Sequence, residues 1–370
     1  MKLKTLYKRN KNKSVSYLEL STRKVSNKDE YYKIRKTGIL NKSKNSISKV
    51  LVEKGKNIGR KNETTCKDQA EKELRSEWTL ELMQKGWKDD LNKVPDVHNT
   101  FYDDSVMPML LNKYSSSKFK PGYAQKKYDG VRCVFEKHNG KYRLKSRKGN
   151  VFNVPHILDQ MVKIASKQAD FTFDGELYLH NTELHDIISV VKKGDPEGIL
   201  NYHIYDVIEH DLEFTKRRNI MLALDASASK NIYVDSGKFV GTKENLDKIN
   251  KSNLMSLFEG TILCNPDSLY DAGFRSSSKV KIKPRVTDEF ECVDQYWNKG
   301  KMSKQTTLIC KNSEGKTFHV KLKGTSKQRE QWAKEFDTKI KNKMITVEYR
   351  KLSKYKTPIE GVGVAVRDYE

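Results

Sequence analysis

The first quarter of the chain alternates short β-prone runs with polar breaks and then becomes helical. Asn, Lys, Ser and Gly separate three runs rich in strand-forming residues, which span 3–8, 14–20 and 31–39. Apolar side chains next recur at steps of four, at Ala70, Leu74, Trp78 and Leu82. This spacing predicts a helix that begins at Thr65 and ends at Gly86. We therefore expect residues 1–90 to form a small α+β module.

A mixed, polar stretch follows this module. Residues 91–120 contain the run Ser115-Ser116-Ser117 and little regular hydrophobic patterning. Such a composition favours a linker that leads into the next domain.

Strand-like and helical runs then alternate from residue 121 to residue 284. Two β-prone runs, 131–135 and 142–146, flank Asn139-Gly140, and Asn-Gly is the strongest short hairpin signal. Further strands are expected at 171–179 and 202–208, and helices at 157–166 and 245–258. The pattern predicts an α+β domain with antiparallel sheets.

The last part of the chain, residues 285–370, is again rich in strand-like runs. They span 289–296, 307–310, 317–321, 344–349 and 362–366, and a helical stretch covers 327–336. Several short strands with one helix predict a small β-barrel of the OB type.

The net charge of the chain indicates which class of partner it binds. The 370 residues hold 72 Lys and Arg against 48 Asp and Glu, a net charge of +24. This surplus favours a polyanion such as nucleic acid, although lysine can also simply solubilise a surface. No run is apolar enough for a membrane span, and the N-terminus leads into no apolar signal segment. The five cysteines lie far apart, which excludes a disulfide scaffold or zinc ribbon and suits a reducing cytosol.

The segment from Lys127 to Arg132, Lys-Tyr-Asp-Gly-Val-Arg, is the pivotal candidate for chemistry. A lysine at a strand end, a glycine turn and an arginine in the next strand bring two cations to one site. Lysine attacks as a nucleophile only when its amine is neutral, and nearby positive charge lowers its pKa. By itself this spacing also suits an ordinary surface turn.

An ordered series of further motifs decides between these interpretations. The series comprises Ser146-Arg147-Lys148-Gly149, Asp174-Gly175-Glu176-Leu177, Ile204-Tyr205-Asp206, Glu259-Gly260-Thr261-Ile262 and the stretch from Tyr270 to Pro284. Each motif alone is more often structural: a surface ion pair, a core aromatic or a solvated edge strand. Together, in this order, they are hard to explain by coincidence.

The ordered motifs resemble those of the covalent nucleotidyltransferases, and most closely those of ATP-dependent DNA ligases. The resemblance runs from Met107-Pro108-Met109-Leu110 to Val366-Arg367-Asp368 near the C-terminus. The assignment to DNA ligases rests mainly on the stretch from Tyr270 to Pro284. Residues 1–90 are in turn similar to the WGR type of nucleic-acid-associated domain, although the Trp-Gly-Arg tripeptide is missing.

The resemblance to DNA ligases implies a role for each matching residue around the nucleotide. Lys127 would attack the α-phosphate of ATP and become the lysyl-adenylate. Tyr205 would stack on adenine, and Gln125 lies where the family contacts the base. Lys281 and Lys283 would neutralise the α-phosphate.

The same resemblance assigns the remaining charged residues. Arg132 and Arg147 would contact the ribose and phosphates of the nucleotide, or the 5′-phosphate of a nicked strand. Glu176 would bind the ribose or a metal, and Glu259 would help to hold the catalytic Mg²⁺ or Mn²⁺. Cys264 departs from the pattern, because a basic residue is frequent there.

We therefore expect nicked double-stranded DNA as the partner and a monomer as the form that binds it. No membrane partner is expected. We expect a cytoplasmic protein, in the host cytoplasm if viral and in the nucleus if eukaryotic. The alternatives are an RNA ligase, an mRNA-capping guanylyltransferase that would load GTP, and a catalytically idle DNA-binding protein. An NAD-dependent ligase is disfavoured because the chain lacks a Cys-rich zinc module.

Overall fold

The computed structural model describes residues 1–96, 99–115, 118–165, 170–224, 229–298, 302–353 and 355–367. It divides into two compact units, Met1–Ile47 with Val52–Ile282 and Ser48–Leu51 with Lys283–Glu370. Four residues named in the sequence patterns lie outside the described residues: Ser116, Ser117, Ser166 and Asp368.

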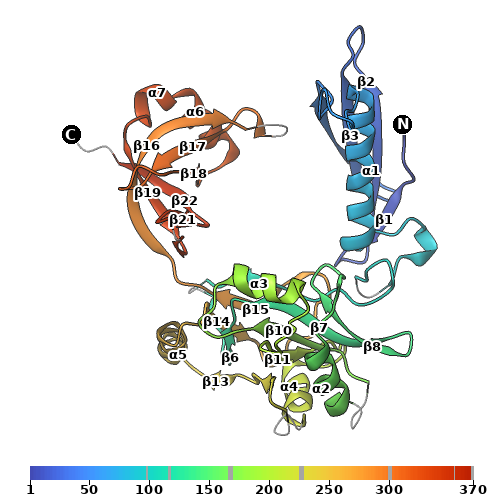
Figure 1. The fold of residues 1–370 in the computed structure, drawn as a ribbon, viewed down its shortest axis with the longest axis vertical. Helices are drawn as coiled ribbons and strands as arrows, with labels where there is room; N and C mark the ends of the chain where they lie inside the picture. The colour runs from blue at the N-terminus through green and yellow to red at the C-terminus, as the bar shows by residue number, and fades with distance from the viewer. Residues whose placement is uncertain are drawn as a thin grey trace. The chain divides into compact units, whose positions relative to one another are not determined.

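A four-stranded antiparallel sheet with one helix on its face begins the chain (Figure 1). Its strands, in spatial order, are β1 (Leu6–Arg9), β2 (Val15–Lys24), β3 (Tyr31–Ile39) and β4 (Asn45–Val52). The helix, α1 (Cys66–Gln84), begins where the sequence predicts, because the Thr65 side chain caps it by accepting from the Asp68 backbone N–H. Leu18 and Leu20 of β2 are buried in one cluster with Leu74 of the helix.

Two sheets form the middle part of the chain. The six-stranded sheet has the order β12-β11-β10-β7-β8-β9, and the five-stranded sheet has the order β13-β6-β14-β15-β5. The strands of the first are β7 (Val131–His138), β8 (Lys141–Ser146), β9 (Val151–Phe152), β10 (Phe173–Tyr178), β11 (Asn201–Val207) and β12 (Ile232–Val234). Those of the second are β5 (Leu110–Lys113), β6 (Gly122–Lys127), β13 (Lys238–Val240), β14 (Gly260–Cys264) and β15 (Arg275–Ile282).

Most strand pairs in these sheets are antiparallel, as predicted. Asn139 and Gly140 both have positive φ and join β7 to β8, which confirms the predicted hairpin. Two pairs are parallel, β12 with β11 and β5 with β15, which agrees with a prediction of mostly antiparallel pairing. The largest buried cluster draws on both sheets, with Cys133 and Phe173 from one and Ile262 from the other.

Helices flank these sheets. They are α2 (Pro155–Ala165), α3 (Leu184–Lys192), α4 (Phe214–Leu222) and α5 (Lys243–Met255), and a short 3₁₀ turn spans Leu91–Lys93. The stretch 91–120, expected as a linker, also contributes the sheet strand β5 and the buried Met109. Among the described residues no helix is long and apolar enough to cross a membrane.

The second unit contains a closed five-stranded barrel with the order β16-β17-β18-β22-β19 (Figure 1). Its strands are β16 (Val286–Trp297), β17 (Thr306–Lys311), β18 (Thr317–Leu322), β19 (Met344–Tyr349) and β22 (Val362–Arg367). The single helix predicted here is divided into α6 (Ser326–Lys334) and α7 (Phe336–Lys339). A two-stranded ribbon, β20 (Lys351–Leu352) and β21 (Pro358–Ile359), precedes the last strand.

Candidate active site

A cavity of about 620 Å³ is lined by residues of both central sheets. The predicted site residues that line it are Lys127, Arg132, Arg147, Glu176, Tyr205 and Lys281. Lys279, which the sequence motifs did not single out, lines it as well. Residues that are far apart in the sequence thus meet at one place, and most of them are charged.

Lys127 ends strand β6 beside the first residue of β14. Its register partner is Gly260, so the preceding Glu259 lies next to it, and the Glu259 N–H donates to the Lys127 carbonyl oxygen at 2.8 Å. The side chains of Lys127 and Glu259 form an ion pair in which both groups are largely buried. A buried carboxylate therefore holds the amine that the sequence predicts as the nucleophile.

Glu176 lies on β10, directly opposite Arg132 of β7. Burial raises the pKa of the Glu176 carboxyl to about 7, although the positive charges of Lys127 and Arg132 oppose this shift. The hydroxyl of Tyr205 also donates to this carboxyl, over 3.4 Å. Glu176 is thus poised between its neutral and charged forms near neutral pH.

Arg132 is tightly held by the protein. Its Nε donates to Asp174 Oδ1 at 2.8 Å, its second terminal nitrogen pairs with the other oxygen of Asp174, and Nη1 donates to the Met109 carbonyl at 2.6 Å. Asp174 also accepts from the Tyr270 hydroxyl at 2.7 Å. These contacts fix a guanidinium at the cavity wall and use most of its N–H groups.

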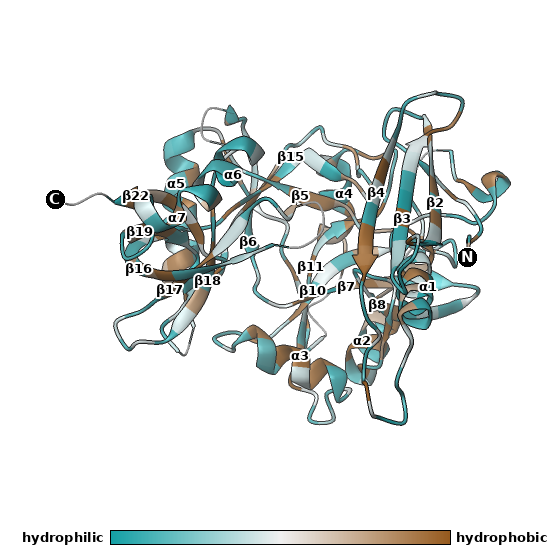
Figure 2. Cartoon of the chain, turned by 90° about the horizontal axis from the view of Figure 1, so that it is seen from above, coloured by the Kyte–Doolittle hydropathy of each residue, from teal (hydrophilic) through white to brown (hydrophobic). Residues whose placement is uncertain are grey.

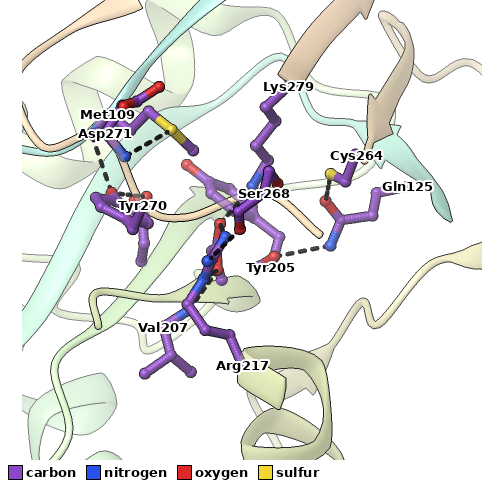
Figure 3. A network of polar contacts seen from close by, with 12 residues as sticks. Met109, Gln125, Tyr205, Val207, Arg217, Cys264, Ser268, Tyr270, Asp271 and Lys279 are labelled. Atoms are coloured by element: carbon purple, nitrogen blue, oxygen red, sulfur yellow. Dashed lines mark hydrogen bonds and ion pairs between the residues drawn. The ribbon is translucent and has the colours of Figure 1, made fainter. Parts of the chain in front are cut away.

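Gln125 does not line the cavity, but its side chain bonds to the main chain of Tyr205, which does. Its side chain is buried, and Nε2 donates to the carbonyl oxygens of Tyr205 at 2.7 Å and Asp235 at 2.6 Å. The thiol of Cys264 donates to Oε1 at 3.1 Å (Figure 3). Both hydrogens of the amide are therefore engaged with main-chain oxygens.

A buried charge network underlies Tyr205. Asp206 accepts from Arg217 Nε at 2.7 Å and from Lys279 Nζ at 2.9 Å. Figure 3 labels the two cations, Arg217 and Lys279. Burial alone would raise the pKa of Asp206, but the two cations outweigh it and lower the pKa. The Lys279 ammonium also lies 5.2 Å from the centroid of the Tyr205 ring.

The sequence offered one signal for Lys279. It lies two residues before Lys281 on the same strand, so both side chains point to the same face of the sheet. Lys283 continues this alternation but belongs to the second unit, where its Nζ lies 3.9 Å from Glu360. It does not line the cavity.

Arg147 lies in the exposed turn that follows β8, on the cavity rim. Its exposure suits contact with a charged group that arrives from solvent. Within the part of the chain that the structure describes, no group of three or more His, Cys, Asp or Glu side chains could hold a metal ion.

Comparisons with known proteins match this geometry. Residues 108–283 match the family model for the ATP-dependent DNA ligase domain. A DNA ligase of African swine fever virus (isolate Warthog/Namibia/Wart80/1980) is 26% identical over 359 residues, which cover 87% of this chain and 80% of the viral protein. A DNA ligase of Methanocorpusculum labreanum is 26% identical over 259 residues, covering 63% of this chain and 46% of that protein.

A solved structure of a Lig E DNA ligase, from work on DNA binding with a minimal scaffold, shares the fold. It has a TM-score of 0.58 at 18% identity and covers 70% of this chain and 98% of its own. The family model over residues 108–283 and the DNA ligase relatives indicate a nucleotidyltransferase. Within that class, the match of residues 108–283 and the DNA ligase relatives support an ATP-dependent DNA ligase, and the chemistry characteristic of that family runs through a lysyl-AMP intermediate. The protein is therefore an ATP-dependent ligase that acts on DNA.

Proposed function

We propose that this ligase seals nicks in duplex DNA and that Lys127 carries the AMP. The observation that supports this assignment best is the position of Lys127 in a cavity shared with Tyr205, Glu176 and Lys281. These groups offer a nucleophile, a flat ring for a base, an acceptor for ribose or metal, and a cation for phosphate.

In the first step, Lys127 Nζ bonds to the α-phosphorus of ATP, and the bond from that phosphorus to the pyrophosphate oxygen breaks. The amine must first lose a proton to solvent, and its side chain is ion-paired with Glu259. Binding of cations or nucleotide at Glu259 therefore has to loosen this pair. Lys279 and Lys281 then stabilise the negative charge that develops on the phosphate oxygens.

Mg²⁺ or Mn²⁺ fits the two carboxylates near Lys127. Glu259 and Glu176 are close enough that the charge of Glu259 raises the pKa of Glu176. Two carboxylates together with substrate phosphates suit an ion that prefers oxygen ligands and keeps several waters. When bound, the ion would neutralise phosphate charge and favour the ionised form of Glu176.

The base is held by Tyr205 and Gln125. Tyr205 lines the cavity with its ring, and Gln125 fixes the backbone of Tyr205 from behind. Arg132 and Arg147 provide cations for the ribose, for the phosphates or for the 5′-phosphate of the nicked strand.

In the second step, an oxygen of the 5′-phosphate at the nick attacks the lysyl-AMP phosphorus, and the bond to Lys127 breaks. In the third step, the 3′-hydroxyl attacks that 5′-phosphate and AMP leaves. A net charge of +24 supplies the cations that hold duplex DNA through these steps.

Each part of the chain has its own proposed role. Residues 1–90 are a DNA-binding module of WGR-like character, 91–120 lead into the catalytic domain, and 121–284 carry adenylation. Residues 285–370 form an OB-fold domain, a proposal supported by their closed five-stranded barrel. Closing of catalytic and OB domains on DNA requires one chain only, so we propose a monomer. It would act wherever the DNA it repairs or replicates is held, in the cytoplasm or the nucleus.

A label-transfer experiment tests the proposal. The protein is incubated with Mg²⁺ and either α-labelled ATP or α-labelled GTP and then denatured, and the labelled residue is mapped by mass spectrometry. We expect label from ATP alone, on Lys127. Label from GTP would instead indicate a capping enzyme. Matched nicked duplexes made of DNA or of RNA then separate a DNA ligase from an RNA ligase.

A further inference from the structure

One face of the N-terminal sheet is not covered by helix α1. Leu18 and Leu20 of β2 are buried beneath the helix, so the residues between and beyond them point the other way. The register places Tyr7 beside Tyr17 and Tyr32 beside Arg23 on this opposite face. We call it the outer sheet face and define it by Tyr7, Arg9, Tyr17, Arg23, Tyr32 and Lys36.

Aromatic rings and cations are next to each other on the outer sheet face. Tyr17 is paired with Gly38, and a Cβ added to Gly38 would lie only 2.7 Å from the tyrosine ring. The ring therefore lies flat over the backbone of β3. The Lys36 ammonium is 5.6 Å from the centroid of the same ring.

The charges on the two faces of this sheet differ. Residues 1–65 hold 19 Lys and Arg but only five Asp and Glu. On the helix side, glutamates of α1 neutralise the cations, because Glu73 pairs with Lys33 and Glu77 pairs with Arg35. On the outer side, Glu19 is the one acidic residue of β1 to β3, and it pairs with Lys36 at 3.1 Å and with Lys2 at 2.9 Å. Arg23 on the same face is exposed. Figure 2 shows β2, β3 and β4 side by side, with polar teal stretches along β3.

We propose that the outer sheet face contacts the sugar–phosphate backbone of duplex DNA beside the nick. This inference rests on the proposed ligase function and names the surface that the module uses. Arg23 and Lys36 would pair with phosphates, which dominate the affinity of proteins for DNA. Tyr17 and Tyr32 would pack against the sugars, because a flat ring on a sheet offers apolar area without a pocket.

Two double variants with the same change in charge test this surface. Arg23→Gln with Lys36→Gln neutralises an arginine and a lysine on the outer sheet face. Arg75→Gln with Lys72→Gln neutralises the same residue types on the exposed side of α1. Binding to a nicked duplex is measured at several salt concentrations, and AMP loading from ATP is measured in parallel.

We expect the outer-face variant to bind nicked DNA about tenfold more weakly near 0.1 M salt, with a log–log salt slope reduced by about 2. The α1 variant should match the parent protein, and both variants should load AMP normally. Equal effects of the two variants, or none, would overturn the inference. Tyr32→Ala provides a second measurement and should weaken binding while leaving the salt slope unchanged, because it removes no charge.

The controls separate this inference from the proposed function. If the parent protein accepts no label from ATP, the ligase assignment fails whatever the outer sheet face does. If loading and sealing are normal and the outer-face variant binds nicked DNA as the parent does, only the surface assignment fails. If the outer sheet face binds another protein instead of DNA, loading, sealing and binding to nicked DNA should all be normal in the outer-face variant.

Discussion

Gln125 donates a hydrogen bond to the main-chain oxygen of Tyr205 at 2.7 Å, although 80 residues separate them in the sequence. The contact joins the strand that ends at Lys127 to the strand that carries the proposed adenine ring. The contact thereby fixes the positions of Lys127 and Tyr205 relative to one another, although their strands belong to two different sheets. Because the contact is buried, it resists exchange with water and keeps that register rigid.

Replacing Gln125 with leucine should loosen this link. The carbonyls of Tyr205 and Asp235 would lose their donor while staying buried, at a cost of about 1–3 kcal/mol in the free energy of unfolding. We also expect a higher KM for ATP, because the Tyr205 backbone would shift. Urea unfolding and loading kinetics measure the two effects. Cys264→Ala removes only the thiol donor to Gln125 and should have the smaller effect on both.

Substitution of Lys127 should remove AMP loading. Lys127→Ala lacks the nucleophile, and Lys127→Arg carries a guanidinium that stays protonated, so neither should take label from ATP. Nicked-DNA binding should persist in both variants. The neighbouring Lys126→Ala is the matched control and should load normally. Label retained in Lys127→Ala would show that another residue accepts the nucleotide.

The raised pKa of Glu176 predicts a pH dependence of stability. The folded protein keeps the Glu176 proton up to about pH 7, whereas the unfolded chain releases it near the ordinary glutamate pKa of about 4.5. Between these values the folded state binds more protons, so stability falls as pH rises, by up to about 3 kcal/mol.

Urea unfolding at pH 5 and pH 8 measures this effect. Glu176→Gln should show a smaller loss over the same interval, because its side chain does not titrate. AMP loading should change in the opposite direction and rise through pH 7 as the carboxylate forms. An identical pH dependence in the parent and in Glu176→Gln would rule out Glu176 as the source.

Arg217 should be required for the stability of the buried charge network around Asp206. Arg217→Met leaves Asp206 buried with Lys279 as its remaining cation, and breaking a buried pair costs about 3–5 kcal/mol. We expect a lower melting temperature and weaker ATP loading. Arg218→Met, one residue further along α4, is the control, because Arg218 is only partly buried and its contacts to described residues are with the Ser236 carbonyl and the Tyr123 ring rather than with Asp206. Equal losses in both variants would contradict the role given to the network.

Local sequence signals predicted many of the strands and helices but overlooked several others, among them the strands β4 and β5 and the helices α3 and α4. Asn139-Gly140 specified its hairpin, and the four-residue spacing that begins at Ala70 specified α1, because both depend on neighbouring residues. Strands β4 and β5 were not predicted. Strand β4 contains serines and an asparagine, which are not typical of strands. Strand β5 lies in a polar stretch and forms a strand through its pairing with β15.

The motif order by itself determined the class of chemistry. Lys127, Glu176, Tyr205 and Lys281 could be named from spacing and resemblance, because catalysis constrains residue type and order. The sequence could not show that Lys279 reaches the site, since its partner Asp206 lies 73 residues away.

Only the tertiary structure decided how the charges are paired. It joins Lys127 to Glu259 and engages Arg132 with Asp174. It also raises the pKa of Glu176 through burial. The physical reason is the same in each case: charge pairing and desolvation depend on distances between residues that only folding brings together.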